Sequence, residues 1–71
     1  MTRDEHLRWA KERALEYVTL NDLPNAVASM ISDLGKHEAF RGPAYSFVLP
    51  LGMAEIPRGK DAVRRWVEGF N

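Results

Sequence analysis

The sequence predicts an all-α protein, a small bundle of about four short helices in which the first two form an antiparallel hairpin. Three observations predict this. Apolar residues recur at helical spacing in the most regular segments. Asn21-Asp22 and later clusters of proline and glycine divide the chain into four segments, and no second strand is present to complete a sheet. A length of 71 residues, 45% hydrophobic and 28% charged, predicts one small folded domain spanning residues 1–71.

The first predicted helix covers residues 3–20. It begins with a capping box, in which the Thr2 hydroxyl accepts a hydrogen bond from the start of the helix and the Glu5 side chain reaches back. An apolar stripe then follows at helical spacing, and Asn21-Asp22 ends the helix. The stripe consists of Leu7, Ala10, Ala14, Tyr17 and Val18.

The second predicted helix covers residues 22–34. Asp22 is a favourable N-cap, Pro24 lies in the first turn where its missing N–H costs nothing, and Gly35 follows the last apolar residue in the manner of a C′ glycine. The short connection forces the two helices into an antiparallel hairpin.

The third segment, residues 43–54, is ambiguous between strand and helix. Tyr45 to Leu49 have the composition of a strand, but a lone strand would leave its backbone polar groups without partners, so we expect a helix. Pro50 disturbs a helix interior, which predicts a kink or a split between Ser46 and Pro50. The Pro57-Arg58-Gly59 breaker then precedes a fourth helix over residues 60–68.

The composition argues against most chemistry. Cysteine is absent, and the two histidines have no convincing set of further ligands, so we expect no metal site, no cofactor and no catalysis, with His6 and His37 at caps and surface positions. No stretch approaches the roughly 18 apolar residues of a membrane helix. The charged start of the chain predicts no signal peptide.

The charges offer one candidate basic patch. Ten basic and ten acidic residues cancel, which argues against a strong nucleic-acid binder. The basic patch surrounds the fourth helix and is either solubilising charge or a contact to nucleic acid or an acidic protein. It consists of Arg58, Lys60, Arg64 and Arg65.

Trp9 is the leading candidate for contact with another protein. It lies well away from the apolar stripe of its helix, beside Glu5 and Arg13. Either the fourth helix or Phe70 covers it, or Trp9, Arg13 and Glu5 form an exposed aromatic–arginine patch of the kind enriched at interfaces.

Self-association is expected from the third segment, which is apolar on nearly every side. Either this segment forms the centre of the bundle, with the other three helices around it, or a second copy of the chain covers it. We expect a twofold homodimer, because it adds core to a chain this small, with an interface centred on Phe47, Leu51 and Met53.

Two resemblances bear on identity. The first two helices resemble a single tetratricopeptide-like helical hairpin at Ala14, Tyr17, Asn21-Asp22-Leu23, Ala26 and Met30. Three longer blocks resemble a family of very small, uncharacterised tailed-bacteriophage proteins: residues 6–18 (HLRWAKERALEYV), residues 26–37 (AVASMISDLGKH) and residues 63–71 (VRRWVEGFN). Residues 38–60 depart from the pattern of that family.

The second resemblance implies an accessory phage protein in the cytoplasm of the infected host, and it supplies no activity. The function predicted is therefore binding to a host or phage protein, without catalysis. The alternative is a DNA-associated regulatory protein that uses the basic patch.

Overall fold

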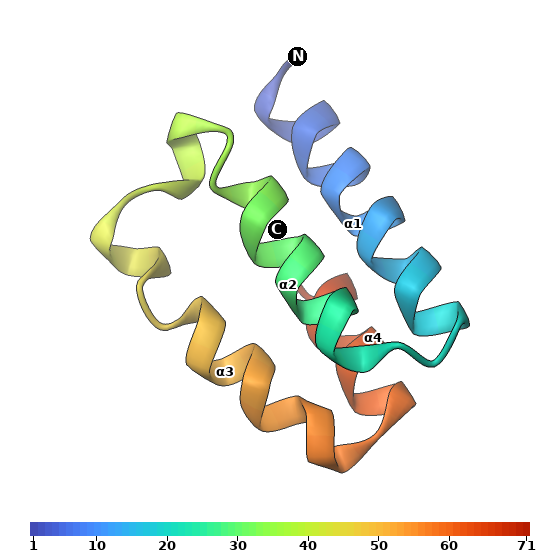
Figure 1. Ribbon diagram of the computed structural model, residues 1–71. Helices are drawn as coiled ribbons and strands as arrows, with labels where there is room; N and C mark the ends of the chain where they lie inside the picture. Colours follow the sequence, from blue (N-terminus) through green and yellow to red (C-terminus); the bar gives the residue numbers. More distant parts are fainter.

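The protein is a bundle of four α-helices linked by short connections, as a computed structural model describes it (Figure 1). The structure describes the backbone of residues 1–71 and every side chain except that of Ala44. The helices are α1 (Arg3–Thr19), α2 (Leu23–Leu34), α3 (Val48–Glu55) and α4 (Lys60–Glu68), and the described residues contain no strand. The all-α prediction is confirmed.

The hairpin of α1 and α2 is built on alanine. Ala10 and Ala14 of α1 and Ala26 of α2 are fully buried, and small side chains at these positions let the two helices approach closely. The capping box of Thr2 and Glu5 is present as expected. Asn21 takes a left-handed conformation (φ 57°) in the turn, which asparagine tolerates better than most residues.

The second helix begins and ends close to the expected residues. Asp22 caps α2 by accepting a hydrogen bond from the Asn25 N–H at 3.4 Å. Gly35 follows α2 in an ordinary right-handed conformation (φ −64°). The helix therefore does not end in the left-handed conformation that is typical of a C′ glycine.

The third segment is split, and the split lies before Pro50. A short 3-10 helix, η2 (Pro43–Tyr45), is separated by Ser46 and Phe47 from α3, which places Pro50 in the first turn. A first-turn N–H has no partner within its own helix, so proline breaks no hydrogen bond there. Two further 3-10 turns, η1 (Glu38–Phe40) and η3 (Ile56–Arg58), lie in segments expected to be irregular. Gly59 (φ 102°) turns the chain from η3 into α4, a conformation that favours glycine.

The core lies where α1, α2 and α4 meet. Met30 and Val27 of α2, together with Val63 and Val67 of α4, are fully buried. In Figure 1, α1 and α3 lie on opposite sides of α2, and α4 is behind it. The alternative in which α3 forms the centre of the bundle is therefore wrong, because α3 is a peripheral helix with one side open.

Candidate functional site

The open side of α3 is an apolar surface, which we call the α3 apolar face: Phe47, Leu49, Leu51 and Met53. These side chains are 69%, 48%, 60% and 55% exposed. Residues 46–54 include no charged residue, so this stretch has no charged side to turn toward water. Exposed apolar side chains gathered in this way make the α3 apolar face a candidate interaction surface.

The inner side of α3 is held against α4 by a close approach at Gly52. This glycine is buried, and a Cβ atom at its position would stand 2.6 Å from the Trp66 ring and 2.9 Å from Val27 Cγ1. The absent side chain therefore lets α3 sit directly on the indole.

An apolar groove runs between α3 and α4. Its volume is about 350 Å³, and its lining consists of Val48, Leu51, Arg65, Trp66, Gly69 and Phe70. The rings of Trp66 and Phe70 pack edge to face with their centroids 5.1 Å apart. Leu51 thus belongs both to the α3 apolar face and to the edge of this groove.

Trp9 is half-buried beneath two cations. The Arg13 guanidinium lies 5.0 Å from the centre of the indole, and the Lys36 ammonium lies 5.5 Å from it. The His6 ring packs against Trp9 at 5.3 Å. The neighbours of Trp9 thus come from α1 and the end of α2, whereas Phe70, expected as a possible cover, packs on Trp66.

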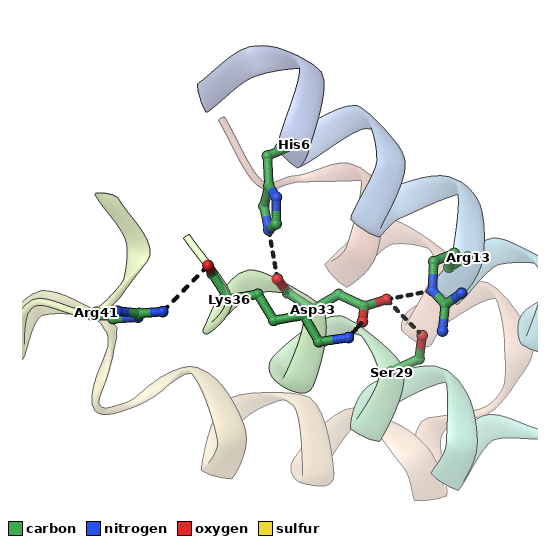
Figure 2. Close-up of polar contacts among 6 residues, drawn as sticks. All are labelled: His6, Arg13, Ser29, Asp33, Lys36 and Arg41. Atoms are coloured by element: carbon green, nitrogen blue, oxygen red, sulfur yellow. Dashed lines mark hydrogen bonds and ion pairs between the residues drawn. The ribbon is translucent and has the colours of Figure 1, made fainter. Parts of the chain in front are cut away.

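Asp33 is the centre of a group of polar contacts that includes Arg13 and Lys36 (Figure 2). Its buried carboxylate accepts hydrogen bonds from Arg13 Nε at 2.7 Å and Lys36 Nζ at 3.1 Å, and Ser29 Oγ lies 3.4 Å away. Burial acts to raise the pKa of Asp33, but the hydrogen bonds from Arg13 and Lys36 outweigh it and hold the pKa below its ordinary value. Arg13 and Lys36 are thereby fixed over the indole.

Glu5, the third member of the expected patch, is engaged at the start of α1. Its carboxylate accepts a hydrogen bond from the Thr2 N–H at 3.0 Å, and this bond lowers the pKa of Glu5. The structure therefore brings Trp9 and Arg13 into contact and gives Glu5 a capping role.

His6 is buried, so the expectation of a surface position for it is wrong. Its Nε2 lies 2.6 Å from the Asp33 carbonyl oxygen, and since a carbonyl only accepts, Nε2 carries the proton. His37 is a cap as expected: its Nδ1 accepts from the Ala39 N–H at the start of η1. The two imidazole rings lie 5.2 Å apart.

Most of the basic patch is occupied within the chain. Arg58 pairs with Glu55 at 3.4 Å, and Arg64 pairs with Asp61 at 3.2 Å. Lys60 Nζ lies 3.5 Å from the Thr19 carbonyl oxygen. The fourth member, Arg65, lines the groove between α3 and α4.

Sequence reasoning missed Asp33 and Phe40. Asp33 interrupts the side of α2 that packs on α1, and a carboxylate there requires cationic partners; Lys36, three residues further on, was an available signal. Phe40 lies between the second and third predicted helices, yet it is buried, with the Arg3 guanidinium 4.7 Å from its ring centre. No periodic pattern surrounds Phe40, so nothing in the sequence signalled its burial.

The importance of Asp33 predicts a pH effect on stability. With its pKa lowered by folding, Asp33 contributes stability at pH values above its unfolded pKa, and this is lost as the pH falls through the folded pKa. Arg13 and Lys36 are about half exposed, 48% and 57%, which screens the pairs, so Asp33→Asn should cost about 1 kcal/mol at pH 7. Urea unfolding at pH 7 and at pH 2 measures it: the cost should be smaller at pH 2 than at pH 7.

The matched control is Asp61→Asn, the same chemical change at a pair whose carboxylate is 80% exposed. It should alter the free energy of unfolding by less than about 0.5 kcal/mol at either pH. An equal loss in both variants at pH 7 would contradict the role given to Asp33.

No three of the His, Asp and Glu residues that the structure describes gather closely enough to hold a metal ion. Within the same described residues, no helix combines the length and the apolar character needed to span a bilayer.

Comparisons of this chain with protein-family models, curated proteins and solved structures find no match.

Proposed function

We propose that this chain is a small phage accessory protein that acts by binding other proteins in the cytoplasm of the infected host, without catalysis of its own. The observation that carries protein binding is the exposure of the α3 apolar face, where four large apolar side chains are about half exposed or more. Such a surface gains free energy by being covered, at roughly 25 cal/mol for each Å² removed from water. The phage assignment rests on the sequence resemblance alone.

Two surfaces support two kinds of contact. The α3 apolar face is uncharged and suits a second copy of the chain, in a homodimer. The Trp9 surface, where Arg13 and Lys36 lie over the indole, combines an aromatic ring with cations and suits a host or phage protein. Because α1 and α3 lie on opposite sides of α2, both surfaces can be occupied at once (Figure 1).

Self-association is tested by light scattering across a concentration series. We expect the mass of a dimer at high micromolar protein, and a monomer for Leu51→Glu, because the new carboxylate would be buried without a partner. A monomer mass for the unaltered chain at the highest concentration would overturn self-association.

The Trp9 surface is tested by affinity capture from lysates of host cells and of infected cells. We expect a specific protein that is captured by the unaltered chain and lost with Trp9→Ala. Leu20→Ala is the control, because Leu20 is 74% exposed at the turn after α1, and it should leave capture intact. Nucleic acid in the eluate, surviving at physiological salt, would instead support the DNA-associated alternative and overturn this proposal.

A further inference from the structure

The groove between α3 and α4 and the side chain of Phe47 stand next to each other. Phe47 precedes Leu51 by four residues, so the two lie on the same side of the chain as it enters α3, and Leu51 lines the groove. Phe47 is 69% exposed, the largest exposed apolar side chain on this part of the molecule. One molecule thus carries both a projecting aromatic ring and an unfilled apolar groove.

We propose that two copies associate around a twofold axis with Phe47 of each copy seated in the α3–α4 groove of the other. This inference rests on the self-association in the proposed function and names the contact that produces it. In a twofold interface, each contact that a residue of one copy makes with the other copy is repeated by symmetry in the opposite direction. Each copy supplies one Phe47 ring and one groove. In a closed dimer both rings are therefore seated and both grooves are filled.

The groove suits a phenylalanine ring. Its volume of about 350 Å³ exceeds that of one aromatic side chain, and its lining is apolar apart from Arg65. Trp66 and Phe70 already pack edge to face, and a third ring would extend that arrangement. The stem of Arg65 can cover the inserted ring while its guanidinium stays in water.

Charge and area are compatible with a second copy. Residues 46–54 carry no charge, and the whole chain has zero net charge, so no charge repulsion between these two segments opposes their approach. A standard interface takes about 800 Å² from each partner. That is about a sixth of the 4518 Å² accessible surface of this chain. Residues 47–70, which include α3 and the residues that line the groove, make up about a third of the chain. This segment is therefore long enough to supply an interface of standard size.

The first test is sedimentation of the full chain at high micromolar concentration. The unaltered protein should be a dimer, and Phe47→Glu should be a monomer under the same conditions. At low micromolar concentration the two should unfold at the same urea concentration, because Phe47 contributes little to the separate chain. Leu20→Glu is the control: Leu20 is 74% exposed at the turn after α1 and should leave the dimer intact.

Disulfide trapping tests the geometry, since the chain has no cysteine of its own. Phe47→Cys and Arg65→Cys proteins, mixed and oxidised, should form a mixed disulfide far faster than Leu20→Cys with Arg65→Cys. A dimer that persists in Phe47→Glu, or equal trapping for the two mixtures, would overturn this inference and leave self-association standing. A monomeric unaltered chain would overturn both.

Discussion

Gly52→Val is expected to lower the free energy of unfolding by about 2–3 kcal/mol, the upper part of the range for overpacking a core. The first carbon of any side chain at this position already meets Trp66 at 2.6 Å and 2.7 Å, and Val27 at 2.9 Å. Valine adds two methyl groups to that conflict. Either Trp66 swings outward or α3 separates from α4, and both outcomes expose apolar surface. Urea unfolding at low micromolar concentration measures the loss.

The control is Gly35→Val, at a glycine that is exposed and has an ordinary right-handed backbone. The nearest atom to a Cβ there is the Ile31 carbonyl oxygen at 3.5 Å, an ordinary contact. We expect a change within about 0.5 kcal/mol. Similar losses at both positions would mean that the conformational freedom of glycine, rather than the close approach of α3 to Trp66, sets the cost.

The regular helices were predictable because their signals are local. The capping box at Thr2 and Glu5, the cap at Asp22 and the 3.6-residue period of the apolar stripes each act within one turn of the chain. The break around Ser46 and Phe47 was likewise predictable, since Pro50 kinks or breaks a helix unless it lies in the first turn.

The arrangement of α3 could not be predicted, because a helix that is apolar all round gives no signal for which side faces inward. The deciding feature is the absent side chain of Gly52, which lets α3 approach Trp66. The periodicity of apolar residues gives no sign of such a contact, because glycine has no apolar side chain to count. The same limit applies to His6 and Asp33, where burial depends on contacts between α1 and α2 that are distant in sequence.

The candidate site was predictable in part. Spacing by four residues placed Arg13 beside Trp9, and the exposure of Phe47, Leu51 and Met53 follows from the excess of apolar residues over available core. The contribution of Lys36 to the Trp9 surface and the groove beside Leu51 depend on how the helices pack, which one sequence does not specify.

Met30→Ala is expected to cost about 3 kcal/mol, within the range for deleting a buried methionine side chain. Met30 is fully buried in the core between α1, α2 and α4. Domains of this size have little stability in reserve, and such a loss should lower the melting temperature by roughly 10–20 °C. Thermal unfolding followed by circular dichroism measures it.

Met53→Ala makes the same chemical deletion on the α3 apolar face, where the side chain is 55% exposed. In dilute protein, where the chains are separate, it should change the free energy of unfolding by less than about 0.5 kcal/mol. At high micromolar concentration it should weaken the dimer, whereas Met30→Ala should lower stability at every concentration. The same substitution therefore separates the two apolar surfaces of this chain, because one is covered by its own fold and the other, in the dimer proposed above, by a second copy. Equal effects of the two variants in dilute protein would show that the α3 apolar face is already covered within a single chain.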